Sequence, residues 1–159
     1  MNKIILTGLS LVVLVCFIFA IVYAQGVLKP GQRSAEQVVL ARKFAMGALA
    51  ANAGDLGAKI KAGNIKGVVT HATSVAALAT FLPLVYEKTY PEVYPVKGSK
   101  YFFKRAVSAQ IEAAAENLRV QAEKLMRLAA ANDKSAVEAQ AGNLFSSCGG
   151  CHKQTRGKY

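Results

Sequence analysis

The sequence predicts an all-α protein: an antiparallel four-helix bundle, preceded by an apolar N-terminal helix. Four segments of the 159-residue chain repeat apolar residues at alternating spacings of three and four, which places those residues on one face of a helix. Alanine is abundant, tryptophan is absent, and no stretch alternates apolar and polar residues as a half-buried strand does. The four apolar faces are therefore expected to pack together in a single domain, residues 34–159.

The first segment begins at Ser34-Ala35-Glu36-Gln37, which has the S-x-x-Q form of a capping box at a helix start. Its apolar face passes through Val39, Arg42, Met46, Leu49, Ala53, Leu56 and Ile60. Arg42 and Met46 stand on this face, one turn apart, where a plain bundle would place aliphatic residues. Both also have a purely structural interpretation, because methionine fills cores adaptably and arginine can lay its stem along apolar surface.

The second and third segments have more uniformly apolar inner faces. The second uses Val68, Ala72, Val75, Ala79 and Leu82. Pro83 is expected to end it, because proline removes a backbone donor and clashes with the preceding turn. Residues 84–100 contain two further prolines and three tyrosines, and they predict a long ordered loop. The inner face of the third segment uses Val107, Ile111, Ala114, Leu118, Ala122, Leu125 and Leu128.

The fourth segment, which Asp133 is expected to cap, holds the most informative motif. Its inner face passes through Val137, Ala141, Leu144, Cys148 and Cys151, with His152 one position round. Cys148, Cys151 and His152 form a C-x-x-C-H run, typical of covalent haem attachment, in which two thioethers hold the porphyrin and the histidine ligates iron. Because both cysteines belong to the inner face, the haem is expected inside the bundle.

Two other uses of this motif fit the sequence less well. A zinc site needs four ligands, and the exported chain offers only His71 besides the motif, with no second C-x-x-C. A thioredoxin-like redox pair is expected in a βαβ context, whereas the residues around the motif predict a helix. Haem attachment is the interpretation that gives all three residues a role.

The first 24 residues, MNKIILTGLSLVVLVCFIFAIVYA, predict export. Lys3 precedes an uncharged, mostly apolar run that is longer than the core of a usual signal peptide and close to the roughly 20 residues that span a bilayer. Val22-Tyr23-Ala24 resembles a cleavage site, so a cleaved signal peptide and a retained membrane anchor both remain open. Cys16 is interpreted as a small apolar residue of this segment. Residues 25–33 form a linker to the bundle.

The exported chain is strongly basic. Without Lys3, the 20 Lys and Arg become 19 against nine Asp and Glu, a net charge of +10. This charge favours acidic protein partners or anionic headgroups. Basic and aromatic residues do not alternate as on surfaces that stack single-stranded nucleic acid, so no nucleic-acid role is expected.

These features resemble the class II c-type cytochromes, the cytochrome c prime family, over essentially the whole exported chain. The resemblance rests on Arg42-Lys43-Phe44-Ala45-Met46 in the first helix, on Asn132-Asp133-Lys134 at the start of the last, and on the C-terminal Cys148-Gly-Gly-Cys-His with Arg156 four residues on. Thr155 stands where the family usually has phenylalanine, and the usual tryptophan-containing stretch before the third helix is absent.

The resemblance implies one covalently bound haem c, with thioethers at Cys148 and Cys151, His152 as proximal iron ligand and Arg42 near a propionate. In the low-spin branch of the family, a methionine at the place of Met46 supplies the sixth ligand, and Met/His ligation raises the reduction potential. An aliphatic or aromatic residue there leaves the iron five-coordinate and able to bind NO or CO. Met126 and His71 are weaker rivals for the sixth position.

The expected function is electron transfer by a periplasmic monohaem cytochrome with His152/Met46 coordination, either soluble or tethered to the inner membrane. Acidic redox proteins are its expected partners, the resemblance leaves a homodimer and a monomer both open, and no catalytic apparatus is visible, so we do not expect an enzyme. Two alternatives remain open. One is a five-coordinate cytochrome c prime that binds NO or CO, and the other is a haem subunit of a membrane-bound respiratory complex.

Overall fold

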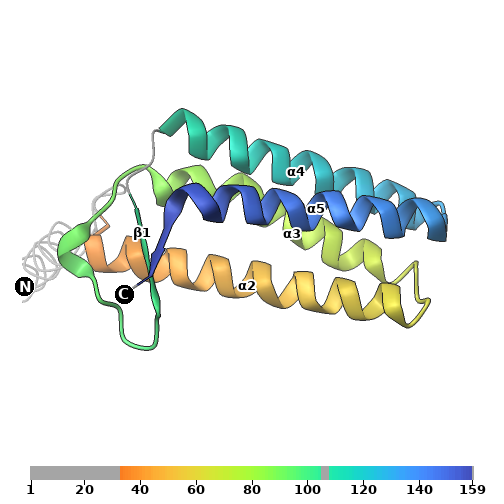
Figure 1. Ribbon diagram of the computed structural model, residues 1–159, viewed down its shortest axis with the longest axis horizontal. Coiled ribbons are helices and arrows are strands. Elements are labelled where there is room, and N and C mark those ends of the chain that lie inside the picture. Colours follow the sequence, from red (N-terminus) through yellow and green to blue (C-terminus); the bar gives the residue numbers. More distant parts are fainter. Residues whose placement is uncertain (1–32, 105–107, 159) are drawn as a thin grey trace, which may run out of the picture. The chain divides into compact units, whose positions relative to one another are not determined.

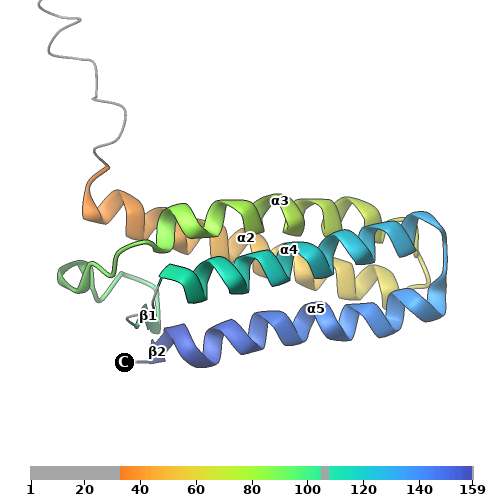
Figure 2. The same ribbon diagram turned by 90° about the horizontal axis from the view of Figure 1, so that it is seen from above.

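Four long helices make up the protein in the computed structural model, which describes residues 33–104 and 108–158 (Figures 1 and 2). They are α2 (Ala35–Lys61), α3 (Val68–Tyr86), α4 (Ser108–Ala130) and α5 (Lys134–Thr155). Consecutive helices run antiparallel, and Ala35–Tyr159 form one compact unit. The predicted antiparallel four-helix bundle is therefore confirmed. The apolar segment 1–24 and nearly all of the predicted linker lie outside the described residues.

The predicted inner faces form the core. Every predicted position of α3 is buried, because the residues at spacings of three and four face the neighbouring helices. Leu56 on α2, Leu125 on α4, and Val137 and Leu144 on α5 are almost completely inaccessible. The predicted cap of α5 is also present, with the Asp133 side chain accepting a hydrogen bond from the Ala136 amide at 3.0 Å.

Pro83 does not end α3, contrary to the prediction. The helix continues one turn further, to Tyr86, with Pro83 inside it. Proline removes its own backbone donor and crowds the preceding turn, but Leu82 before it and Val85 two residues after it are buried. The packing of these two side chains offsets the local cost of the proline.

Two short strands are a second difference from the prediction, which included no β structure. Strand β1 (Tyr101–Phe103) pairs antiparallel with β2 (Arg156–Lys158), so that Tyr101 lies opposite Lys158 and Phe103 opposite Arg156. The Lys104 amide extends the ladder by donating to the Thr155 carbonyl at 2.7 Å. Strands of three residues are too short to show a period of two in the sequence. The pair joins the loop before α4 to the chain end beyond α5 (Figure 1).

The helices pack unequally around the bundle. Helix α3 makes extensive contact with α2 and with α4, and α4 packs along α5. Helices α2 and α5 touch each other far less than these pairs do. The seam between α2 and α5 is therefore the part of the bundle that side chains of neighbouring helices fill least.

Helix α3 is the member of the described chain whose length and apolar composition would allow it to cross a membrane. Its buried residues belong to the common core of the bundle. A core helix of a bundle and a membrane span have similar compositions, so this property adds nothing to the location predicted from residues 1–24.

Candidate haem site

A cavity of about 430 Å³ opens between α2 and α5, with α3, α4 and β1 completing its walls. The side chains that line it are predominantly apolar or aromatic, among them Leu49, Leu82, Tyr86, Phe103, Leu118 and Leu144. The cavity lies toward the end of the bundle where α3 and α5 finish, next to the paired strands. It contains all five of the residues proposed from the sequence as the cofactor site.

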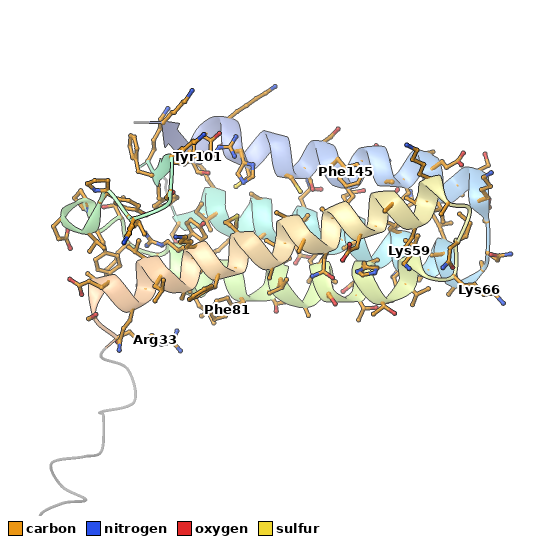
Figure 3. The ribbon with its side chains drawn as sticks, turned by 90° about the horizontal axis from the view of Figure 1, so that it is seen from below. Arg33, Lys59, Lys66, Phe81, Tyr101 and Phe145 are labelled. Atoms are coloured by element: carbon orange, nitrogen blue, oxygen red, sulfur yellow. The ribbon has the colours of Figure 1, made fainter. Side chains whose placement is uncertain are left out.

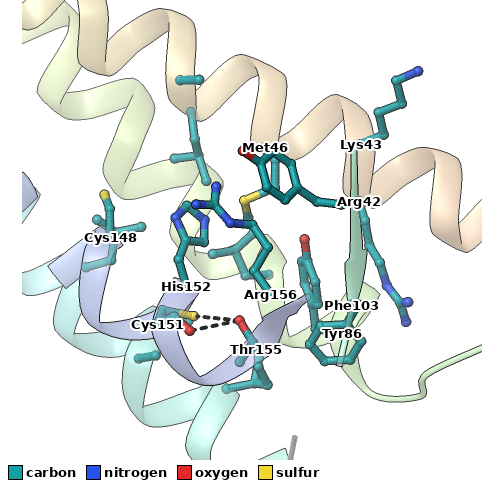
Figure 4. Close-up of a pocket in the computed structure, with 18 of the residues that line it drawn as sticks. Arg42, Lys43, Met46, Tyr86, Phe103, Cys148, Cys151, His152, Thr155 and Arg156 are labelled. Carbon is teal, nitrogen blue, oxygen red and sulfur yellow. Dashed lines mark hydrogen bonds between the residues drawn. The ribbon is translucent and has the colours of Figure 1, made fainter. Parts of the chain in front are cut away.

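The last two turns of α5 bring Cys148, Cys151 and His152 to one wall of this cavity (Figure 4). A spacing of three residues places the two thiols on the same helix face, and both cysteines are free. The Cys148 Sγ lies 3.6 Å from the Leu144 carbonyl oxygen, and the Cys151 Sγ lies 3.7 Å from the Thr155 hydroxyl. Each thiol is only partly buried, so both remain accessible from the cavity.

Burial shifts the pKa of the Cys148 thiol and of the His152 imidazole. It raises the pKa of the Cys148 thiol and lowers the pKa of the His152 imidazole, to which the nearby Arg156 charge adds a further decrease. His152 is therefore neutral at neutral pH, and neutral imidazole is the form that can donate a nitrogen lone pair to a metal.

Met46 reaches the cavity from the opposite wall, on α2 (Figure 4). Its side chain is half-buried and packs against the core cluster. Neither rival for the sixth ligand is near. His71 accepts or donates a hydrogen bond at 3.2 Å with the Asn52 side chain, Met126 packs on the core, and neither lines the cavity. Within the described chain, Met46 is thus the thioether that faces His152.

Arg42 has a role that the sequence did not reveal. Its side chain is buried, and all three guanidinium nitrogens donate to backbone carbonyls at the end of α3: Nε to Val85, Nη2 to Lys88 and Nη1 to Thr89 at 2.9 Å. These carbonyls include acceptors that a helix end leaves unpaired, and the positive charge complements the helix dipole. The propionate contact implied by the resemblance stays a prediction.

Aromatic rings surround the Arg42 guanidinium and form part of the cavity wall. Its Cζ atom lies 5.1 Å from the centroid of Tyr86 and 4.9 Å from that of Phe103, within cation–π range. Tyr86 and Phe103 meet edge to face at 4.8 Å. Burial raises the pKa of the Tyr86 phenol, so it stays protonated, although the Arg42 charge opposes this shift. Arg42 therefore orients two residues of the cavity wall.

The strand pair closes one edge of the cavity. Phe102 lines the cavity and lays its ring directly on Gly157 of the opposite strand, and Tyr94 packs edge to face on the same ring. Arg156 lies over the Tyr101 ring at 4.3 Å. No sequence pattern predicted these contacts, because they depend on pairing two segments more than 50 residues apart.

Replacing Gly157 with alanine is expected to lower the melting temperature of the haem-loaded protein by about 5 °C. The added Cβ would lie 2.3 Å from the nearest Phe102 ring carbon, so the ring must move or the strands must separate, at a cost of about 1–3 kcal/mol. Gly142→Ala on α5 is the matched control, because its Cβ would meet nothing within 4 Å and alanine favours the helix by up to about 1 kcal/mol. Calorimetry that finds both variants equally stable would contradict this account.

The residues of the cavity fit a covalently attached porphyrin. Two free thiols on one helix face, an adjacent neutral imidazole and a mostly apolar enclosure are the features that such a group requires. They do not fit zinc, because among residues 33–104 and 108–158 no three His, Cys, Asp or Glu side chains gather as a metal site. The motif also lies on a helix rather than in a βαβ unit, unlike a thioredoxin-type pair.

Solved structures similar to this chain include several cytochromes c prime. One, described as having an unusual ligand-controlled dimer dissociation, is 21% identical and superposes with a TM-score of 0.67, covering 80% of this chain and all of its own. A nitric oxide complex from Alcaligenes xylosoxidans is 19% identical, with a TM-score of 0.63 over 79% of this chain and 100% of that one. The protein from Rubrivivax gelatinosus is 20% identical, with a TM-score of 0.59 over 76% and 95%.

The family assignment comes from the sequence model rather than from these distant structures. No curated protein sequence matches the chain. The family model described as cytochrome C′ matches residues 37–156, from the first turn of α2 to the arginine after the haem motif. The chain therefore belongs to the cytochrome c prime family, whose members hold one covalently attached haem c.

Proposed function

We propose that Cys148 and Cys151 hold the haem through thioethers and that His152 is its proximal iron ligand. The support is the position of these three side chains on one cavity wall, with the imidazole neutral. Helix α5 fixes their relative positions, because all three belong to its last two turns. The haem supplies an iron centre that can change oxidation state or accept an axial ligand.

On the side of the cavity opposite His152, we propose that the haem site reversibly binds a small diatomic molecule, NO or CO. The single observation behind this proposal is the apolar wall that α2 presents across the cavity from His152. Apart from Arg42 and Lys43, the α2 side chains on this wall are Val39, Met46, Leu49, Ala50 and Ala53, which exclude water and offer no charged competitor. Similar solved structures include a nitric oxide complex of a cytochrome c prime from Alcaligenes xylosoxidans.

Electron transfer with Met46 as sixth ligand is the second candidate. The observation that favours it is the Met46 thioether, which reaches into the cavity from α2 while His152 reaches in from α5 (Figure 4). A methionine ligand would compete with a diatomic molecule for the same position. It would also keep the iron coordination unchanged between oxidation states, which suits electron transfer.

Adding CO to the ferrous protein tests the first candidate against the second. We expect complete binding by the wild type, and we expect Met46→Leu to change the CO dissociation constant less than about threefold, or about 0.7 kcal/mol. Met126→Leu is the control, because Met126 packs in the core away from the cavity.

Electron transfer with Met46 as ligand predicts a different spectrum and a different CO affinity. If Met46 ligates iron, the wild-type spectrum is low-spin with a sulfur-to-iron band, which Met46→Leu removes. The leucine variant then binds CO at least tenfold more tightly, because the competing ligand is gone. That outcome would replace diatomic binding by electron transfer as the function.

We further propose a periplasmic, non-enzymatic protein that pairs as a homodimer, soluble or tethered by residues 1–24. Large apolar side chains on α2 and α3 support a paired surface: Phe44 is 66% exposed and Leu84 is 69% exposed. A similar cytochrome c prime is described as a dimer that dissociates under ligand control. A subunit role in a respiratory complex rests only on the apolar N-terminal segment.

A further inference from the structure

Exposed basic side chains gather at the mouth of the haem cavity. They come from α2, from the loop before α4, from the end of α5 and from β2: Lys43, Lys97, Lys100, Lys104, Lys153, Arg156 and Lys158. We call these seven residues the cationic rim. Two of them, Lys43 and Arg156, also line the cavity itself (Figure 4).

Contacts between distant segments hold the rim together in space. The Lys43 Nζ donates to the Lys97 carbonyl at 2.8 Å, which joins α2 to the loop. The strand register then places Lys158 opposite Tyr101, the neighbour of Lys100. On the other side, the hydrogen bond between the Lys104 amide and the Thr155 carbonyl brings that lysine to the end of α5. The rim is therefore one surface, although its residues are up to 115 positions apart in the sequence.

No rim residue forms an ion pair within the part of the chain that the structure describes. The ion pairs of that part join Arg119 to Glu116 and Glu123, Arg127 to Glu123, Lys134 to Glu138, and His71 to Asp55. All of these lie along α2 to α5, away from the strand pair. Among the described residues, seven exposed cations without an ion-pair partner create a positive local potential at the rim.

The haem accounts for only part of this charge. Its two propionates could neutralise at most two of the seven rim cations, so most of the positive charge remains available. The opposite end of the bundle also carries lysines, but Glu123, Asp133 and Glu138 lie there too, and two of these carboxylates form ion pairs given above. Lys59 and Lys66 mark that end in Figure 3, far from Tyr101 at the rim. Positive charge is therefore concentrated at the end of the bundle where another molecule would approach the haem.

We propose that the cationic rim is the docking surface for an acidic redox protein, which exchanges one electron with the haem. This inference rests on the proposed haem site. A protein surface fits better than a membrane, because stable insertion into the headgroup region uses exposed apolar side chains beside the basic ones. On the strand pair, the exposed aromatic residue is Tyr101, and the Arg156 guanidinium covers its ring.

Oxidation of the ferrous protein by ferricyanide tests the proposal. One electron leaves the haem iron and converts each ferricyanide to ferrocyanide. We expect the rate to fall steeply as salt is added, because the Debye length shrinks from about 10 Å at 0.1 M to about 3 Å at 1 M. The cationic oxidant hexaammineruthenium(III) is expected to show the opposite salt dependence. This measurement needs no variant, and equal salt dependence for the two oxidants would overturn the proposal.

Two variants of equal net charge then test whether the rate of the ferricyanide reaction depends on the cationic rim or on total charge. The rim variant combines Lys97→Gln, Lys100→Gln, Lys104→Gln and Lys158→Gln, and the control combines Lys59→Gln, Lys61→Gln, Lys66→Gln and Lys124→Gln. At low ionic strength, the rim variant is expected to react about tenfold more slowly with ferricyanide, and the control less than about twofold. Equal slowing in both variants would show that the reaction rate depends only on total charge, and it would overturn the proposed docking role of the cationic rim.

The class of partner is tested with poly-L-glutamate and with phosphatidylglycerol vesicles. Poly-L-glutamate is expected to slow the ferricyanide reaction of the wild type and control but not that of the rim variant. Rim-dependent binding to vesicles without an effect of poly-L-glutamate would assign the rim to a membrane instead. Haem content and CO binding should be unchanged in both variants, because none of the eight lysines lines the cavity. If the wild type contained no haem, that result would contradict the proposed function and would leave the docking role of the cationic rim as a separate question.

Discussion

Replacing Cys148 and Cys151 together with serine is expected to abolish covalent haem attachment. Both thiols lie on the wall of the cavity, and no other cysteine occurs among the described residues. Serine preserves the size and polarity of the site but cannot form a thioether. Haem-dependent peroxidase staining after denaturing electrophoresis should therefore fall to background, a loss of more than about 95% relative to wild type.

Single replacements sharpen this result. Cys148→Ser or Cys151→Ser leaves one thiol and should retain a reduced covalent signal with a shifted pyridine haemochrome spectrum. Cys16→Ser is the control, because this residue lies in the N-terminal segment and should leave attachment unchanged. Full staining of the double variant would rule out both assigned attachment sites.

Replacing Arg42 with methionine is expected to destabilise the haem-loaded protein by about 3 kcal/mol, the largest stability effect that we predict for a single side chain. Methionine keeps an apolar stem of similar length but removes three hydrogen bonds to the carbonyls of Val85, Lys88 and Thr89. Hydrogen bonds from a charged donor each contribute about 1.5–3 kcal/mol, although water can partly replace them at the exposed Lys88. Guanidinium unfolding monitored by circular dichroism measures the loss.

Lys43→Met is the matched control for Arg42. Lys43 is the next residue on α2, is exposed, and makes one hydrogen bond to a loop carbonyl. Its replacement should cost less than about 1 kcal/mol. Arg42→Lys should lie between the two, because an ammonium group cannot reach all three carbonyls in the fork geometry of a guanidinium. A loss below about 1 kcal/mol for Arg42→Met would mean that Arg42 does not secure the end of α3.

The helices could be predicted from the sequence because each one buries a face that recurs with the helical period. The residues at these positions, such as Val75 and Leu82 on α3, are buried as that period requires. The three haem-motif residues could also be placed together, because their spacing within α5 is local. In both cases the signal extends over only a few residues of contiguous chain.

Contacts between distant segments could not be predicted in the same way. Arg42 lines the cavity as expected for a cofactor residue, and its hydrogen bonds to residues 43–47 positions along the chain could not be predicted. The end of α3 was placed at Pro83 from local proline geometry, while Val85 keeps the helix going through burial. The strand pair depends on where β2 emerges from α5, which three residues of sequence do not encode.

The unequal packing of the bundle has a consequence for the order in which the protein matures. Helices α2 and α5 meet sparsely, and the cavity lies in their seam, so the cofactor supplies contacts that these helices do not make with each other. Ligand binding to the folded chain alone adds to its stability. Before haem is attached, α2 and α5 would therefore open more often than α3 and α4, and their backbone amides would exchange with solvent faster. The sparse contact between α2 and α5 leaves the two thiols accessible to the incoming porphyrin. Once the thioethers form, the attached haem would fill the space between these helices.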